Sequence, residues 1–396
     1  MESARCLFWL PKKQRNCGFP RLPESQYCSQ HASSESGFVP CPLDPRHKVQ
    51  TDKLSHHLVI CNKTKAQKQV TELPYYSKGI AVLKPDYQDV NISLKNWNAE
   101  ETHMLIGRIN QLYEEAAGLY HARTGESLPP VTVPRAPKPD KRQHIQSQVL
   151  VQVMETCGLL QTGVSYIEFG AGKGALSHYI AERTTAHHFL IERAPMRNKY
   201  DKLHSHTFVR LQADIADIDL KRVNLIGAVI CVGKHVCGGA TDLSLVSVLR
   251  SGVELEGAVL ATCCHHRCTL STFIGSEVLS SLGMSETEQM QLFKASSWGP
   301  SGAVRLEEGQ EAVSMAKSEA GLKAKRIIDI ARVLYLSDVG LSGRLFQYCD
   351  NSLTPENMVL VARKCWRPGY CVALFAVRKA RFCLYQAWAL WPASAN

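Results

Sequence analysis

The first 61 residues contain five cysteines, separated by Pro, Gly and Ser, and show no sustained apolar period of a helix or strand. A segment this short buries too little apolar surface to fold without metal ions or disulfides. The whole chain has 15 cysteines, an odd number, and its N-terminus lacks the apolar stretch of a signal peptide. Metal ligation is therefore the better explanation for these cysteines than disulfide bonding.

Two quartets of Cys and His follow one another in this segment, with the spacings C-x10-C-x10-C-x2-H and C-x5-H-x9-H-x3-C. Each quartet offers the four thiolate or imidazole donors of a closed, tetrahedral structural zinc site, and neither leaves a position open for catalysis. We predict zinc modules at 1–35 and 36–65, holding one structural ion each. The ligands are Cys6, Cys17, Cys28 and His31 in the first, and Cys41, His47, His57 and Cys61 in the second. His56 is the alternative to His57.

The net charge of +10 is concentrated at the two ends of the chain. Residues 1–84 carry 13 Lys and Arg against 6 Asp and Glu, and residues 365–396 carry 4 basic residues and no acidic ones. A basic module beside a nearly neutral one favours contact with a polyanion such as RNA, although a solvated, solubilising surface also explains it. No apolar run reaches the length of a membrane span and no targeting signal stands out, so we expect no membrane partner and a cytoplasmic or nuclear location.

The rest of the chain predicts an α/β fold. A helix should begin after Asn98, with Glu101 completing a capping box, inside a helical and linker region at 66–140. Short apolar runs then alternate with helix-sized gaps, which is typical of a mostly parallel sheet covered on both faces. The expected strands are 164–169, 189–192, 207–213, 228–232, 258–262 and 357–362, with a long helix at 318–337. This domain, at 141–364, should be Rossmann-like, and the basic tail at 365–396 is left unassigned.

A glycine-rich loop, E-F-G-A-G-K-G, follows the first expected strand of this domain and leads into a helix. Gly170, Gly172 and Gly174 let the backbone approach a ligand closely, and the helix N-terminus offers free N–H groups. The same loop also satisfies the dinucleotide fingerprint G-x-G-x-x-G/A, so a Rossmann dehydrogenase is an alternative.

Three acidic residues favour a methyl donor over a dinucleotide. Glu168 can reach the amino group of a methionine moiety, and Glu192, at the end of the second strand, can bind ribose hydroxyls. Asp214, after the third strand, can accept a hydrogen bond from an adenine amino group. One carboxylate at each of three strand ends suits S-adenosylmethionine, and the dinucleotide fold explains only Glu192.

Two dense polar clusters follow the fourth and fifth expected strands, G-K-H-V-C-G-G and T-C-C-H-H-R-C. Such titratable residues at strand ends are unlike core filling. We interpret them as substrate-positioning groups. A third zinc is the alternative, taking ligands from Cys237, Cys263, Cys264, Cys268 and the histidines, but the adjacent pairs of Cys and of His are not expected to point at one metal together.

The order of these motifs, with G-K-H-x-C-G-G-A-T-D-L, C-C-H-H-R-C and K-R-I-I-D-I-A-R, resembles the eukaryotic tRNA 2′-O-methyltransferases that modify the fourth nucleotide of the acceptor stem. The resemblance covers about residues 5–364, and the tail after them departs from the family. It implies a class I methyltransferase fold, S-adenosylmethionine, two zinc ions and the tRNA acceptor stem as partner. It gives no indication of DNA binding or of protein partners.

The expected reaction moves a methyl group to a ribose 2′-oxygen, and alignment of the reactants should supply most of the rate. Lys234 and His235 are the candidate bases. Asp242 is a candidate for orienting His265 or Arg267, either of which can hold a flanking phosphate. The main alternative is a non-catalytic zinc-finger RNA-binding protein, since similar CHHC fingers occur in a spliceosomal protein. A protein or small-molecule methyltransferase is a third interpretation, which the basic N-terminal region disfavours.

Overall fold

The computed structural model describes residues 5–10, 14–22, 25–28, 30–31, 38–90, 92–94, 97–131, 142–197, 199–299 and 311–364. The chain divides into two compact units, Met1–Tyr76 and Ser77–Asn396, and each is described by itself. The end of the predicted linker region, 132–140, and the basic tail, 365–396, lie outside the described residues. No helix in the described ranges is long and apolar enough to cross a membrane.

The N-terminal unit consists of two small antiparallel hairpins and two short helices. Its elements are β1 (Trp9–Leu10), β2 (Arg15–Asn16), β3 (Phe38–Cys41), β4 (Asp44–Gln50), α1 (Leu54–Ile60) and α2 (Asn62–Thr71). The buried centre of its first half is formed by Cys6, Cys17 and Cys28 with Leu10 packed beside them. Gln30 joins the two halves, because its side chain accepts from the backbone N–H of Lys48 at 3.1 Å and donates to the Lys48 carbonyl at 3.4 Å.

The larger unit is built on a seven-stranded sheet of order β10-β11-β9-β8-β5-β6-β7. Five central and edge strands run parallel, and β11 lies antiparallel between β9 and β10. The bounds are β5 (Ser165–Phe169), β6 (His187–Ile191), β7 (Phe208–Leu211), β8 (Val229–Cys237), β9 (Leu255–Cys263), β10 (Leu341–Gln347) and β11 (Met358–Lys364). The sequence predicted all of these except β10, whose Gly343 and Arg344 interrupt the apolar run.

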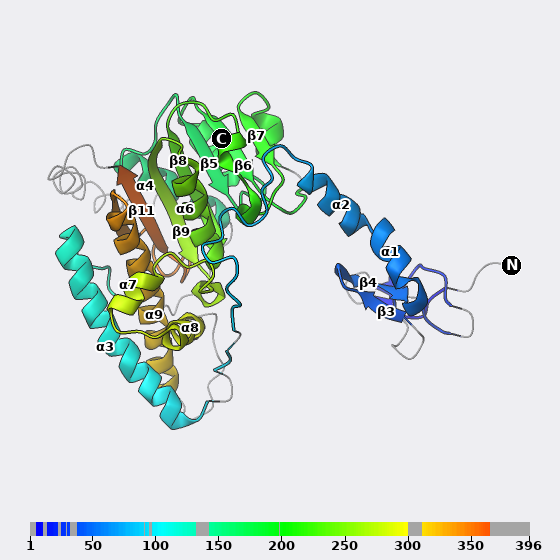
Figure 1. The fold of residues 1–396 in the computed structure, drawn as a ribbon, viewed down its shortest axis with the longest axis horizontal. Helices are drawn as coiled ribbons and strands as arrows, with labels where there is room; N and C mark the ends of the chain where they lie inside the picture. The colour runs from blue at the N-terminus through cyan, green and yellow to red at the C-terminus, as the bar shows by residue number, and fades with distance from the viewer. Residues whose placement is uncertain are drawn as a thin grey trace, which may run out of the picture. The chain divides into compact units, whose positions relative to one another are not determined.

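Helices cover both faces of this sheet (Figure 1). They are α3 (Ala99–Thr124), α4 (Arg142–Thr156), α5 (Ala175–Ala181), α6 (Gly239–Ser251), α7 (Ser276–Ser281), α8 (Glu286–Ala295) and α9 (Glu311–Asp338). On one face, α4 and α5 bury their apolar side chains against alternate residues of the central strands. On the other, α6 packs on β8 and β9, and α9 packs on β10 and β11. The sheet is thus buried on both sides, as its nearly continuous apolar strands require.

Helix α3 begins with the capping box that the sequence predicted. The Asn98 side chain accepts from the Glu101 N–H at 2.8 Å, and the Glu101 carboxylate accepts from the Asn98 N–H at 2.8 Å. The helix packs along α9, and its buried Tyr120 hydroxyl accepts from the Leu345 N–H at 3.1 Å. This helix, which the sequence placed in a region separate from the α/β domain, belongs to the larger compact unit.

Candidate active site and metal clusters

The glycine loop turns between β5 and α5 through three residues with positive φ: Gly170 at 62°, Gly172 at 51° and Gly174 at 83°. L-residues with side chains rarely adopt this conformation. A Cβ built on Gly170 or Gly172 meets nothing within 4 Å, whereas one on Gly174 lies 2.5 Å from Leu190 Cδ2. Gly174 therefore seats the loop on the sheet, while the other two glycines leave the backbone open to an approaching ligand.

The three acidic residues stand where the sequence placed them, at or beside the carboxyl ends of neighbouring parallel strands β5, β6 and β7. The Glu192 carboxylate accepts from the Gly172 N–H at 3.1 Å and from the Ala194 N–H at 2.8 Å, so it is fixed against the glycine loop. Asp214 caps the short 3-10 helix Ile215–Asp217 by accepting from the Ala216 N–H at 3.1 Å, and Arg193 lies 3.3 Å from its other oxygen.

Glu168 is almost completely buried, and it accepts one backbone hydrogen bond, from Ser177, at 3.0 Å. Burial raises the pKa of this carboxyl to about 7. Within the described residues no cation pairs with it at ion-pair distance. A buried carboxyl beside an open glycine loop fits a ligand that brings its own positive charge, as the ammonium and sulfonium of S-adenosylmethionine would.

The first polar cluster contains an irregularity of β8. The register with β9 shifts between Lys234 and Val236, and His235 between them has a φ of 62°. Lys234 is partly buried, and its Nζ donates to the Gln143 carbonyl at 2.6 Å and to the Ser147 hydroxyl at 2.8 Å. Burial lowers the pKa of Lys234 to about 8, and the charge of Glu168 opposes that decrease. Lys234 is thus held in place, and a minor fraction of its amine is neutral at physiological pH.

The partners of Lys234 and His235 lie on α4, and the sequence did not reveal them. His235 Nε2 is 3.2 Å from the Gln146 Oε1 atom, and these contacts join residues 87 to 91 positions apart. The sequence feature that could have indicated these partners is the polar run Q-H-I-Q-S-Q, which begins a helix whose later residues are apolar.

The second polar cluster is tied to α9 by a buried network that the sequence also missed. The Thr262 hydroxyl donates to Asp329 at 2.8 Å, and His265 Nε2 lies 2.9 Å from the same carboxylate. Arg332 Nη1 donates to Asp329 at 3.0 Å. Although burial alone would raise the pKa of Asp329, His265 and Arg332 hold it well below its usual range.

Asp242 does not have the role that the sequence suggested. It is fully buried and pairs with Arg332, from which it accepts two hydrogen bonds of 3.0 and 2.6 Å. The carboxylate next to His265 is that of Asp329, not that of Asp242. Asp242 has no exposed surface with which to touch a substrate, and its charge is compensated by the arginine.

Arg267 is exposed at the tip of this cluster, in the 3-10 helix His265–Arg267. Among the described residues its guanidinium has no hydrogen-bond or ion-pair partner. A Cβ on Gly238 would lie 2.6 Å from the Arg267 Cβ, which means that the loops after β8 and β9 touch.

Three thiols also meet between these loops. The Sγ atoms of Cys237, Cys263 and Cys264 lie within 4.8 Å of one another. The adjacent Cys263 and Cys264 both point to this place, because the backbone at Cys264 is left-handed, whereas neither His265 nor His266 joins the group. Cys268 is not part of the group, since its Sγ accepts from Arg332 at 3.2 Å.

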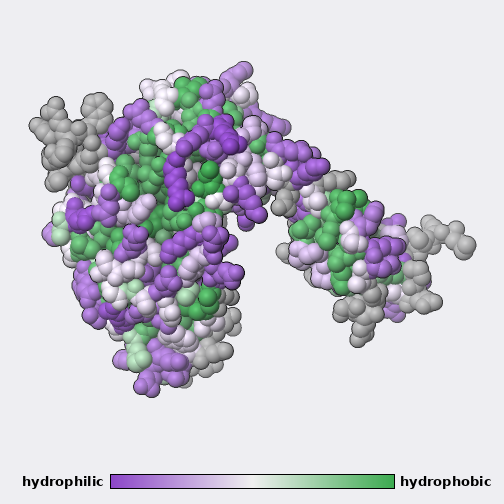
Figure 2. Space-filling model, in the orientation of Figure 1, coloured by the Kyte–Doolittle hydropathy of each residue, from purple (hydrophilic) through white to green (hydrophobic). Residues whose placement is uncertain are grey.

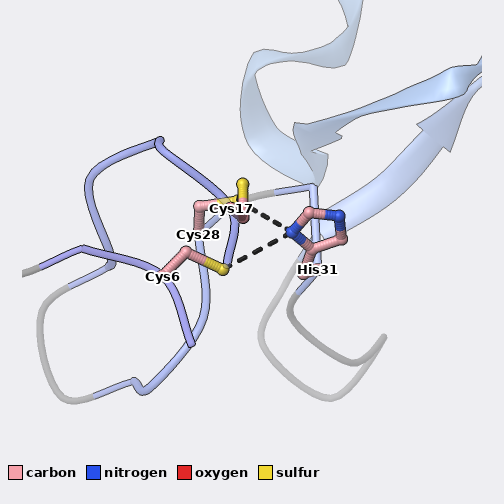
Figure 3. A group of neighbouring side chains, drawn as sticks. All are labelled: Cys6, Cys17, Cys28 and His31. Atoms are coloured by element: carbon pink, nitrogen blue, oxygen red, sulfur yellow. Dashed lines mark hydrogen bonds between the residues drawn. The ribbon is translucent and has the colours of Figure 1, made fainter. Parts of the chain in front are cut away.

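The two N-terminal quartets come together as the sequence predicted. His31 Nδ1 lies 3.4 Å from the sulfurs of both Cys6 and Cys28, and the Cys17 and Cys28 sulfurs are 4.0 Å apart (Figure 3). A tetrahedral zinc ion places two sulfurs about 3.8 Å apart and a sulfur and a nitrogen about 3.5 Å apart. The donors of this cluster thus fit zinc in kind and in spacing.

The second quartet is equally well assembled. His47 Nε2 lies 2.9 Å from His57 Nε2 and 3.8 Å from the Cys61 sulfur, and Cys41 completes the group. Cys41 and Cys61 are buried, and His57 is half-buried. The neighbouring His56 is exposed and outside the cluster, which decides between the two histidines.

The topology and the loop define the class of protein. A seven-stranded sheet with its last strand inserted antiparallel, and a glycine loop ringed by carboxylates at the carboxyl ends of β5, β6 and β7, is the class I S-adenosylmethionine-dependent methyltransferase fold. Residues 145–363 match the family Methyltransferase TRM13. The chain belongs to this family.

The fingers match as well. Residues 4–32 match the CCCH zinc finger in TRM13 protein, and residues 38–62 match the U11-48K-like CHHC zinc finger. The chain is 28% identical to the tRNA:m(4)X modification enzyme TRM13 of Eremothecium gossypii over 91% of its length and 95% of the relative. It is 25% identical to the enzyme of Saccharomyces cerevisiae, over 92% of this chain and 96% of the relative. It is also 25% identical to the homolog of Homo sapiens, over 90% of this chain and 94% of the relative.

Proposed function

We propose that the protein is a tRNA methyltransferase that uses S-adenosylmethionine to methylate the ribose 2′-oxygen of the fourth nucleotide in the acceptor stem. The observation that carries the proposal is the meeting of the open glycine loop, the unpaired Glu168 and the fixed Lys234 at one edge of a methyltransferase sheet. The family match and the names of the relatives, tRNA:m(4)X modification enzymes, support tRNA and its fourth position.

Three residues would hold the donor. Glu168 would face its amino group, Glu192 its ribose hydroxyls and Asp214 its adenine amino group. Bound S-adenosylmethionine supplies a methyl group activated by its sulfonium. Glu192 is already fixed by the Gly172 N–H, so the loop and this carboxylate form a preorganised cradle.

Lys234 is the better of the two candidate bases. The new bond would join the 2′-oxygen to the methyl carbon as the carbon–sulfur bond breaks, and the hydroxyl proton would pass to the neutral amine of Lys234. A pKa of about 8 leaves part of the Lys234 population neutral at pH 7.5, and the contacts to Gln143 and Ser147 restrict the side chain. Proton transfer of this kind contributes roughly 10²- to 10⁴-fold in rate. His235, held by Gln146, is the second candidate.

Arg267 would hold a phosphate next to the target ribose. It is exposed, it is unpaired among the described residues, and its planar group suits bidentate phosphate binding. The buried network of Asp329 and Arg332 keeps the loop that carries it in place.

The N-terminal unit would bind the RNA, with one structural zinc ion in each quartet. Its surface carries hydrophobic residues beside hydrophilic ones (Figure 2). Trp9 and Phe19 are exposed, as are Arg5 and Arg15. Basic side chains neutralise phosphates, and exposed aromatic rings stack on unpaired bases.

The test is methyl transfer from isotope-labelled S-adenosylmethionine to tRNA that lacks the modification, with the full chain and with a Glu192→Ala variant. Mass spectrometry of nuclease fragments should find a 2′-O-methyl group on nucleotide 4, and the variant should transfer far less. A methyl group on a base or at another position would contradict the proposal. Binding of tRNA without methyl transfer would favour a non-catalytic RNA-binding protein. Labelling of a protein in the absence of RNA would favour a protein methyltransferase.

A further inference from the structure

We propose that Cys237, Cys263 and Cys264 bind a thiolate-preferring divalent cation, zinc, as three of its four ligands. The site lies at the carboxyl ends of β8 and β9, apart from the two finger quartets. The inference does not depend on the RNA substrate proposed above.

The positions of the three sulfurs follow from the backbone. Cys237 and Cys263 stand opposite each other in the parallel ladder of β8 and β9, with their sulfurs 3.3 Å apart. As the next residue of a strand, Cys264 would point to the other face of the sheet. Its φ of 47° and ψ of 40° instead turn its thiol back toward the other two.

The backbone strain at this place calls for a compensating interaction. Among the described residues only Gln14, His235 and Cys264 have positive φ without being glycine. Of these, Cys264 is one of the three thiols, and His235 stands two residues before another, Cys237. The irregularity at His235 is what puts Cys237, rather than Val236, opposite Cys263. Strained residues persist where their surroundings hold them, and they gather at functional sites. A metal ion bound by all three sulfurs would hold both loops in this arrangement.

The thiols are also unlike the core cysteines of the same sheet. Cys231, earlier on β8, is completely buried among apolar strand residues. Cys237 and Cys264 are only half-buried, so apolar packing does not account for their convergence. A tetrahedral zinc ion holds two sulfurs about 3.8 Å apart. Here one pair of sulfurs is 3.3 Å apart and all three lie within 4.8 Å of one another, so small shifts would bring them to that spacing. Three sulfur donors suit zinc far better than magnesium or calcium.

A disulfide between Cys237 and Cys263 is the competing explanation of the short sulfur distance. It would use two thiols, would need an oxidant, and would give no reason for the strained turn at Cys264. The two explanations differ in what a metal analysis and a peptide map find.

The first experiment counts zinc in the full chain, purified with reductant and without chelator. Elemental analysis should give three zinc ions per chain, and two in Cys237→Ser and in Cys264→Ser. Cys349→Ser, which removes another half-buried cysteine of the same unit, should keep three. The proposal is overturned if the wild-type chain holds two ions and a variant lacking both finger sites, Cys28→Ser with Cys61→Ser, holds none.

A second measurement needs no variant of the cluster. Alkylation of the wild-type chain, mapped by mass spectrometry, should label Cys237 and Cys264 slowly, and a zinc chelator should accelerate it at least tenfold. The rate at Cys349 should not change. Equal rates with and without chelator, or a peptide pair joined through Cys237 and Cys263 in the purified protein, would overturn the proposal.

Discussion

Arg332 on α9 and Asp242 on α6 form an ion pair in which neither side chain has any exposed surface, with Nη2 2.6 Å from Oδ2. The same arginine donates to the Gly238 carbonyl at 3.3 Å and to Asp329 at 3.0 Å. Although burial disfavours its charge, the adjacent Asp242 raises the pKa of Arg332 well above its usual value. One helix residue thus holds the loop after β8 through Gly238 and Asp242, and the loop after β9 through Cys268 and Asp329.

Replacing Arg332 with Met should destabilise the larger unit by about 3–5 kcal/mol, because two buried carboxylates lose their partner. Arg183→Met is the matched control, since the Arg183–Glu155 pair is exposed and should contribute less than about 1 kcal/mol. Urea unfolding followed by tryptophan fluorescence measures both. Equal losses of unfolding free energy in the two variants would show that the buried network stabilises the unit no more than an exposed ion pair does.

Glu168→Gln should have opposite effects on stability and on donor binding. Burial raises the pKa of Glu168 to about 7 from 4.5, so the folded state keeps a proton that the unfolded state loses. The contribution of Glu168 to the free energy of unfolding is therefore fully present below pH 4.5, and it is lost as the pH rises through 7. At about 1.4 kcal/mol per pKa unit, the glutamine variant should be the more stable one at pH 8, by on the order of 3 kcal/mol.

Thermal unfolding of wild type and Glu168→Gln from pH 5.5 to 8.5 measures the difference, which should grow with pH. Calorimetry at pH 8 should show that the variant binds S-adenosylmethionine at least tenfold more weakly. A stability difference independent of pH would mean that Glu168 does not titrate in this range.

The pH dependence of turnover tests Lys234. The amine accepts a proton only when neutral, so kcat should rise with pH through about 8, the pKa of Lys234. Lys234→Gln should lower kcat by roughly 10²-fold or more and abolish that rise. It should leave the KM for S-adenosylmethionine within about threefold. Lys221→Gln, on the surface of the same unit, serves as control. An unchanged pH profile in Lys234→Gln would transfer the role to His235.

The second finger offers a control one residue away. His57→Asn should cost one zinc ion per chain and weaken tRNA binding, because His57 is in the quartet. His56→Asn should change neither, because His56 is exposed and outside it. Elemental analysis and a filter-binding titration give the two readouts. If the His56 variant lost zinc and the His57 variant kept it, His56 would be the ligand in place of His57.

Local spacing predicted the finger ligands, the glycine loop and the three acidic strand ends. These features depend on short sequence distances, a helix N-terminus, or the rule that ligands bind at the carboxyl ends of parallel strands. Glu192 illustrates this, since its contact with Gly172 follows from the order of β5 and β6.

The remaining contacts depend on packing between distant segments. Gln143 and Ser147 meet Lys234 only because α4 covers that face of the sheet, and Arg332 meets Asp242 across 90 residues. The sequence offered the convergence of Cys263 and Cys264 only as an alternative, for another reason. It depends on a left-handed residue, which a cysteine rarely is.

Asp329 and Arg332 stand three residues apart on α9 and act together. Inserting or deleting one residue between them would turn the arginine by about 100° around the helix axis and shift it by about 1.5 Å. The two loops would then lose their shared anchor even though every side chain of the site were still encoded. The length of this turn is therefore as much a part of the site as its residues, and a chimaera that grafts the loops elsewhere must carry this turn unchanged.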